Sequence, residues 1–240
     1  MKPAIVIPAR YKSSRFEGKP LTPIKGRAMI EWVWRRCVDA LSEDQVYVAT
    51  DDDRIAAHCR GVGIAVVMTP TTCLTGTDRV HEASKQIDAD LLINVQGDEP
   101  LLDPSDIEAV LAAAAAHPGD IINAMCPITD EADFRSPSVP KVVARPDGRL
   151  MYMSRAAIPT GKDFGFHGAM KQVCIYAFPT EPLAAFAAAG GKTPAEGIED
   201  IEILRFLELG HEVRMIEVSS SSIAVDFPDD VARVEAAWRD

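Results

Sequence analysis

Residues 4–21 read AIVIPARYKSSRFEGKPL, a short apolar run followed by a basic segment. The β-branched run from Ile5 to Ile7 is typical of a buried strand, which we expect Pro8 to end. The basic loop that follows, residues 10–19, contains four cations within ten positions: Arg10, Lys12, Arg15 and Lys19. Open α/β sheets bind ligands at the carboxyl ends of their strands, and Arg and Lys bind phosphate oxygens. The stretch therefore predicts an anion site, with a nucleoside triphosphate as the expected anion.

Two common nucleotide motifs are missing near this strand. The sequence has no G-x-x-x-x-G-K-[ST], because Gly18-Lys19 is followed by Pro20, and no G-x-G-x-x-G follows the strand. The missing glycine fingerprint argues against a nicotinamide-dependent oxidoreductase. A basic loop that is merely solvated is the alternative explanation for the charge.

Composition narrows the possible partners and compartment. The 240 residues have a formal net charge of -11, which argues against binding to nucleic acid or to a membrane surface, since both are polyanionic. The five cysteines are scattered without a C-x-x-C pair, as in a protein with reduced thiols. The first apolar stretch is too short for a secretory signal, and no segment is long enough to span a bilayer. We predict a cytoplasmic protein.

Strands alternate with helices through the first half of the chain. Strands are expected at 45–50, 64–67 and 91–95, and helices at 28–40, from 51–53, at 78–87 with Thr77 as N-cap, and from 103–104. This alternation predicts a doubly wound, mostly parallel α/β sheet of Rossmann-like type.

The pattern changes after residue 127. Residues 129–178 are expected to form an inserted subdomain with a β-hairpin at 142–152 around a Pro-Asp-Gly turn. A capping box at 193–196 predicts a helix that runs to Leu209 and stops at Gly210. Strands at 212–218 and 223–225 and a closing helix from 226–230 complete one domain, residues 1–240.

Two aspartates stand at predicted strand ends, Asp98 and Asp226. Mg²⁺ in phosphoryl-transfer sites is typically held by one or two carboxylates together with substrate phosphates. The pair therefore suffices for a Mg²⁺ site. Asp226 could instead only cap a helix, and Asp98 could only shape its Gly-Asp turn. Asp51, also at a strand end, could line the nucleotide site.

Residues 8–21, which include the basic loop, closely resemble the signature loop of the CMP-Kdo synthetases, also called 3-deoxy-manno-octulosonate cytidylyltransferases. Further segments are similar to that family along nearly the whole chain: 49–51, 75–79, 94–100, 154–159, 175–176 and 225–229. The resemblance implies a nucleotidyltransferase that uses CTP and a 3-deoxy-ulosonic acid, with Mg²⁺ as cofactor. It also implies a homodimer built with the inserted hairpin region.

The resemblance also implies roles for individual residues. Arg10, Lys19, Asp98 and Asp226 would act in catalysis, and the two aspartates would bind the metal. The nucleotide would be bound by Pro8, Ala9, Arg10, Ser13, Arg15, Lys19, Thr50, Asp51, Thr75 and Gly76. The sugar acid would be bound by Arg79, Gln96, Arg155, Tyr176, Glu199 and Glu202.

Two positions depart from the family pattern. Gln172 stands where the family usually has a histidine, and Ile203 stands where it has a glutamine, both near the sugar acid. The substrate could then be a modified acid such as an amino-Kdo or another nonulosonic acid, or Ile203 could be a core residue. The acidic row Glu196, Glu199 and Glu202 could likewise be only a solvated helix face.

A non-catalytic nucleotide-sugar-binding protein is the alternative from a different class. It is disfavoured because both aspartates and the basic loop are present.

Overall fold

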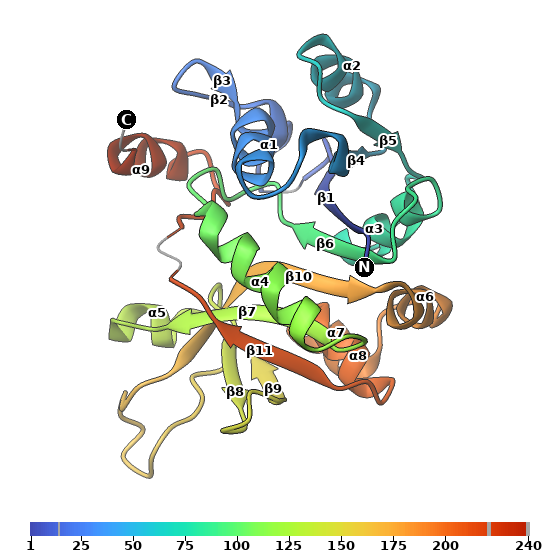
Figure 1. The fold of residues 1–240 in the computed structure, drawn as a ribbon. Coiled ribbons are helices and arrows are strands. Elements are labelled where there is room, and N and C mark those ends of the chain that lie inside the picture. The colour runs from blue at the N-terminus through green and yellow to red at the C-terminus, as the bar shows by residue number, and fades with distance from the viewer. Residues whose placement is uncertain (14, 220–221, 239–240) are drawn as a thin grey trace. The chain divides into compact units, whose positions relative to one another are not determined.

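A computed structural model describes residues 1–13, 15–219 and 222–238 (Figure 1). The chain forms two compact units, one of Met1–Glu108 with Ser221–Asp240 and one of Ala109–Ser220. The predicted mixed α/β fold is confirmed. The predicted single domain and the 129–178 bounds of its insertion stay predictions.

Four parallel strands form the sheet of the first unit: β1 (Pro3–Ala9), β4 (Val46–Thr50), β5 (Val66–Met68) and β6 (Leu91–Val95). They lie in the order β6-β1-β4-β5. The expectation that Pro8 ends the first strand is wrong, because β1 continues through Pro8, which pairs with Ala49. One missing N–H removes a single ladder bond and leaves the bonds on either side in place.

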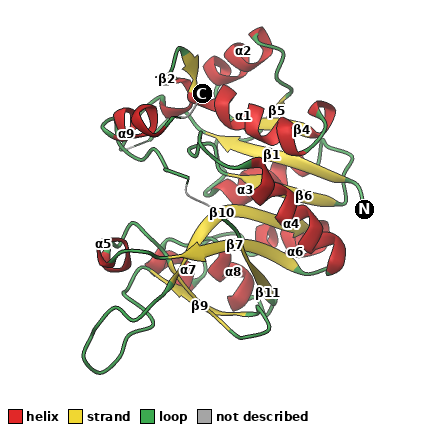
Figure 2. Cartoon of the chain, turned by 60° about the vertical axis from the view of Figure 1, so that its left-hand side comes forward, coloured by secondary structure: helices red, strands yellow, loops and turns green. Residues whose placement is uncertain are grey.

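The helices of this unit, drawn in red in Figure 2, are α1 (Met29–Ala40), α2 (Asp53–Gly61) and α3 (Gly76–Ser84). The first five residues of α4 (Pro104–Ala116) also belong to it, because the unit includes the chain up to Glu108. Because parallel crossovers are right-handed, the change of direction between β5 and β6 places α3 on the sheet face opposite α1 and α2. The first unit is therefore doubly wound. Short elements complete it: η1 (Lys19–Leu21), β2 (Pro23–Ile24), β3 (Arg27–Ala28) and η2 (Glu43–Gln45).

The chain returns to the first unit at its C-terminal end. Helix α9 (Asp230–Ala237) packs Val234 into a core with Ile24, Met29 and Val225. The ring centroids of Trp238 and Trp32 lie 4.4 Å apart. The predicted strand at 223–225 is wrong: the backbone N–H of Val225 donates to Asp98 O, and no strand is assigned at 223–225. This packing holds Asp226 near the end of β6.

The second unit has five strands: β7 (Ile121–Pro127), β8 (Lys141–Ala144), β9 (Leu150–Ser154), β10 (Met170–Pro179) and β11 (Val213–Glu217). β11 is parallel to β7, whereas β10 pairs antiparallel with β7 and β8. β8 and β9 pair antiparallel, which confirms the predicted hairpin. The helices are α5 (Glu131–Arg135), α6 (Thr180–Ala188), α7 (Pro194–Glu199) and α8 (Ile203–Glu208).

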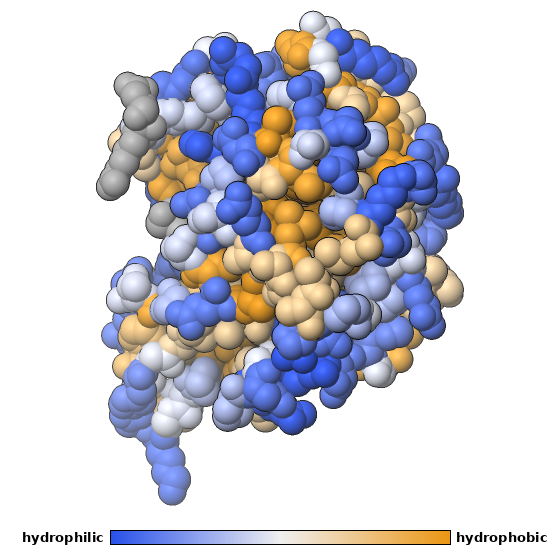
Figure 3. Space-filling model, in the orientation of Figure 1, coloured by the Kyte–Doolittle hydropathy of each residue, from blue (hydrophilic) through white to orange (hydrophobic). Residues whose placement is uncertain are grey.

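No helix in the described part of the chain is both long and apolar enough to cross a membrane. Hydrophilic side chains cover much of the face drawn in Figure 3, with hydrophobic patches between them. The predicted cytoplasmic location stays a prediction.

Candidate functional site

The basic loop leaves the sheet directly after β1. Its two ends are joined by a hydrogen bond of 2.9 Å from the Gly18 N–H to Tyr11 O. Gly18 has a φ of 70°, in the left-handed region that glycine adopts without strain, and it directly precedes η1. Within the loop, Ser13 Oγ accepts a bond of 3.2 Å from the Phe16 N–H. The loop is thus a closed turn that presents Lys19 at a fixed place.

Lys19 joins the two predicted metal ligands. Its ammonium donates to Asp98 Oδ2 at 2.8 Å and to Val225 O at 2.8 Å, and it lies 3.9 Å from Asp226 Oδ1. Arg15 Nη2 lies 3.1 Å from the same Asp226 oxygen. The structure therefore brings together four of the residues predicted for catalysis and phosphate binding, and each of these carboxylates faces at least one loop cation.

The donor set around Lys19 suits a divalent cation. Two carboxylate oxygens and one backbone carbonyl already surround a positive charge, so the lysine ammonium stands in for a metal ion. No group of three or more His, Cys, Asp or Glu side chains able to hold a metal occurs among the residues that the structure describes. Mg²⁺ needs only one or two carboxylates when water and phosphates supply its other ligands. The residues present fit that requirement.

A second group of predicted residues lies around the start of α3. The side chain of Thr75 accepts from the Asp78 N–H and caps the helix, so the expected cap at Thr77 is wrong. Helix α3 begins two residues earlier because Thr75 and Asp78 form a reciprocal capping box. Gly76 lies so close to Gln96 that a Cβ added there would be 2.9 Å from Gln96 Nε2.

The guanidinium of Arg79 forms hydrogen bonds with two neighbouring side chains. The side chain is 4% exposed, and its guanidinium bonds to Asp51 Oδ2 at 3.1 Å and to Thr69 Oγ1 at 2.5 Å. Two predicted site residues, the buried Arg79 and the partly buried Asp51, therefore meet as an ion pair. Thr50 is fully buried, and its hydroxyl accepts from the Asp52 N–H at 3.2 Å.

The structure brings together two of the predicted sugar-side residues of the second unit, Glu199 and Arg155. Glu199 accepts from Ser154 Oγ at 2.6 Å and from the Arg155 N–H at 2.8 Å. The Arg155 guanidinium in turn donates to the carbonyls of Glu199, Asp200 and Pro137. Tyr176 is 6% exposed and stacks on Phe178 at 5.6 Å, while Glu202 is half-buried at the start of α8.

Lys141, the first residue of β8, supports this arrangement. Its fully buried ammonium donates to the carbonyls of Ser136, Val139 and Arg155 at 2.6–2.7 Å. Burial lowers the pKa of Lys141 from its usual value. Three carbonyl acceptors compensate for that burial, and they fix the backbone at Arg155.

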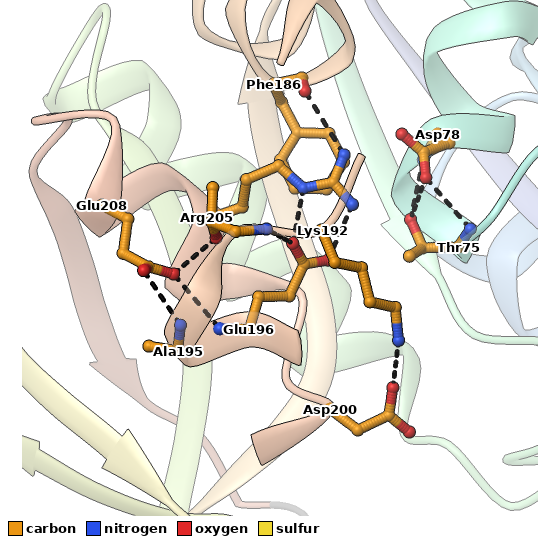
Figure 4. Close-up of polar contacts among 10 residues, drawn as sticks. Thr75, Asp78, Phe186, Lys192, Ala195, Glu196, Asp200, Arg205 and Glu208 are labelled. Atoms are coloured by element: carbon orange, nitrogen blue, oxygen red, sulfur yellow. Dashed lines mark hydrogen bonds and ion pairs between the residues drawn. The ribbon is translucent and has the colours of Figure 1, made fainter. Parts of the chain in front are cut away.

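The predicted helix over 193–209 is wrong. The capping box at Thr193 forms as predicted, but α7 ends at Glu199, and Asp200 adopts a left-handed φ of 52°. The solvated-face reading of the acidic row is also wrong for Glu196, which is fully buried and bonds Arg205 twice at 2.7 Å (Figure 4). The turn at Asp200 brings α8 back against α7 so that these two side chains pair.

The two positions that depart from the family pattern have different environments. Gln172 Nε2 donates to Asn123 Oδ1 at 3.0 Å, and Asn123 Nδ2 in turn bonds the carbonyls of Val173 and Ile175 at an irregularity of β10. Ile203 is 1% exposed, and so it is a core residue of the second unit.

A parallel α/β unit with a cationic loop after its first strand, and with paired aspartates at that loop, defines the class of nucleotide-binding α/β proteins. Comparison with known proteins gives the family. The cytidylyltransferase family model matches residues 4–215, and the chain belongs to this family.

Close relatives carry two names. The chain is 41% identical over 241 residues to the 8-amino-3,8-dideoxy-manno-octulosonate cytidylyltransferase of Shewanella baltica strain OS155, with 98% of each sequence covered. It is also 41% identical over 244 residues to the 3-deoxy-manno-octulosonate cytidylyltransferase of Syntrophotalea carbinolica, with 98% of this chain and 97% of the relative covered. A solved structure of a CMP:2-keto-3-deoxy-manno-octonic acid synthetase complexed with CTP matches with a TM-score of 0.92 at 34% identity, covering 99% of this chain and 98% of that one.

Proposed function

We propose that this protein transfers CMP from CTP to the anomeric hydroxyl of 3-deoxy-manno-octulosonate, releasing pyrophosphate. The observation that carries the proposal is the meeting of Lys19, Asp98 and Asp226 beside the basic loop. Family membership and a similar structure that is complexed with CTP support the nucleotide.

The chain's own residues suit this reaction. The new O–P bond forms at the α-phosphorus while the bond to the pyrophosphate oxygen breaks, so no protein nucleophile is required. Arg10, Arg15 and Lys19 would neutralise the triphosphate and the departing pyrophosphate. Asp98 and Asp226 would hold Mg²⁺, which when bound supplies charge neutralisation and lowers the pKa of the attacking hydroxyl.

The sugar acid would be recognised by Arg79, Gln96, Arg155, Tyr176, Glu199 and Glu202. Arg155 is held by three carbonyl oxygens, which neutralise none of its charge, so the guanidinium retains a net attraction for a carboxylate. We further propose a homodimer formed with the β8–β9 hairpin and a role in lipopolysaccharide precursor synthesis in the cytoplasm.

The 8-amino sugar acid is the second candidate substrate. Relatives with that name are as similar to this chain, at 41% identity, as a relative named for the unmodified acid. Because the Gln172 amide nitrogen is already engaged by Asn123, its carbonyl oxygen is the group left to accept a hydrogen bond from a ligand, and an ammonium donates such a bond.

The test is pyrophosphate release from CTP and Mg²⁺ with each of the two sugar acids offered separately. Turnover with either acid supports a cytidylyltransferase and identifies the preferred one, whereas no turnover with both acids contradicts the proposal. We expect Asp98→Asn to lower turnover by about 10²- to 10³-fold, as the loss of one electrostatic group typically does.

Asp103→Asn is the matched control. Asp103 is a nearby carboxylate that bonds Ser105 at the start of α4, and asparagine caps helices equally well. Near-normal turnover in Asp98→Asn would remove Asp98 from the mechanism.

A further inference from the structure

The basic loop is supported from outside by a side chain on α2. The guanidinium of Arg54 lies over the ring of Tyr11, with its carbon 3.3 Å from the ring centroid. Tyr11 is the second residue of the basic loop. Arg54 is distant from this loop in sequence, and neither residue belongs to the predicted site.

Asp52 fixes the orientation of that guanidinium. Arg54 Nε donates to Asp52 Oδ1 at 2.9 Å and Nη2 donates to Oδ2 at 2.7 Å, so the fork is held bidentately. Asp52 is itself the N-cap of α2, where it accepts from the Arg54 N–H at 3.0 Å. These hydrogen bonds from Arg54 lower the pKa of Asp52 from its usual value, so the carboxylate stays charged at neutral pH.

Tyr11 in turn packs against Gly18, near the other end of the basic loop. A Cβ built on Gly18 would lie 3.1 Å from both Cζ and Oη of Tyr11, so the ring packs directly against the Gly18 backbone. Tyr11 O also accepts from the Gly18 N–H. Because Gly18 immediately precedes Lys19, the position of the Tyr11 ring affects where the Lys19 ammonium lies.

We propose that Arg54 is a positioning residue that holds the basic loop in its CTP-binding conformation by stacking on Tyr11. This inference rests on the proposed use of CTP. Arg54 is not itself a phosphate ligand, because its guanidinium N–H groups already donate to Asp52 and one face of the guanidinium stacks on Tyr11. Its contribution is to raise the fraction of molecules in which the loop is closed, and apparent affinity scales with that fraction.

The experiment measures CTP binding by calorimetry, together with KM for CTP and kcat, for wild type and for Arg54→Ala. The Arg54 side chain is exposed, and loss of a cation–π contact at an exposed position corresponds to a weakening of roughly two- to fivefold. We expect Kd and KM for CTP to rise by that factor while kcat changes little. Arg54→Lys, which keeps a cation over the ring, should recover part of the affinity.

Arg60→Ala is the matched control, since Arg60 lies on the same helix, is exposed and forms no ion pair with a described residue. A double-mutant cycle with Tyr11→Leu tests the route. If Arg54 acts through Tyr11, the two effects on Kd will be less than additive, and Tyr11→Phe will weaken binding less than Tyr11→Leu.

Two outcomes would overturn the inference. Unchanged CTP affinity in Arg54→Ala, with a loss of thermal stability only, would make Arg54 a structural residue of α2. Fully additive effects in the cycle would show that Arg54 does not act through Tyr11. Failure of the wild type to bind CTP at all would instead contradict the proposed function, so the two failures are distinguishable.

Discussion

Replacing Lys19 with methionine should increase metal affinity in the absence of nucleotide. The Lys19 ammonium occupies the position between Asp98 and Asp226 that a divalent ion would take. A metal ion entering the nucleotide-free protein must therefore displace this ammonium or accept its repulsion. Lys19→Met removes the competitor and keeps most of the side-chain volume.

The magnitude follows from the contacts that the metal must break. The Lys19 side chain is 18% exposed, and its ammonium donates at 2.8 Å to both Asp98 Oδ2 and Val225 O. A hydrogen bond that involves a charged group contributes about 1.5–3 kcal/mol net. Loss of that competition corresponds to roughly ten- to hundredfold tighter metal binding.

The assay is Mn²⁺ binding followed by electron paramagnetic resonance, with and without CTP. Without CTP, Lys19→Met should bind Mn²⁺ more tightly than wild type. With CTP the difference should shrink, because in the wild type the triphosphate attracts Lys19 away from the carboxylates. Lys12→Met is the control: it removes an equal charge from the same loop, and Lys12 forms no ion pair with a described residue. Equal Mn²⁺ affinity in wild type and Lys19→Met without CTP would refute the reasoning.

Two further predictions concern stability. Burial lowers the pKa of His81 below its usual 6.5, so the unfolded chain takes up this proton first as the pH falls. The stabilisation is complete above pH 6.5 and decreases as the pH falls toward the folded-state pKa. Urea unfolding should show that the free energy of unfolding falls less between pH 7.5 and pH 5.5 in His81→Gln than in wild type. An equal fall in both proteins would contradict this prediction. Glu196→Gln should lower the free energy of unfolding by about 3–5 kcal/mol, because it removes one charge of the buried Glu196–Arg205 ion pair. The double variant that also carries Arg205→Met should recover part of the lost free energy of unfolding. A Glu196→Gln variant as stable as wild type would show that the Glu196–Arg205 ion pair is not stabilising.

Local chemistry in the sequence predicted much of the fold. The alternation of strands and helices identified the doubly wound first unit, and the Pro-Asp-Gly turn identified the β8–β9 hairpin. The capping box at Thr193 correctly marked the start of α7. Each of these signals lies within a few residues of the structure that it predicts, which is why sequence alone sufficed.

The wrong predictions concern positions where contacts between residues distant in sequence determine the local structure. Nothing near Asp200 predicts its left-handed turn, because the carboxylate of Glu199 is held by Ser154 and Arg155 from the hairpin. The alternative that the acidic row is only a solvated face fails at Glu196 for the same reason. The partner of Glu196 is Arg205, and it is reached only after the helix breaks.

The candidate site shows the same division. Both aspartates were predicted as metal ligands from their places at predicted strand ends, but the distance of Asp226 from Lys19 depends on α9 returning the chain to the first unit. The sequence also predicted that Lys19 binds phosphate and Asp98 binds metal, without indicating that the two side chains pair with each other when no ligand is bound. In the structure the two neutralise each other. Because each must exchange its partner when ligands bind, the affinities for metal and for nucleotide should be positively coupled, and such coupling is reciprocal.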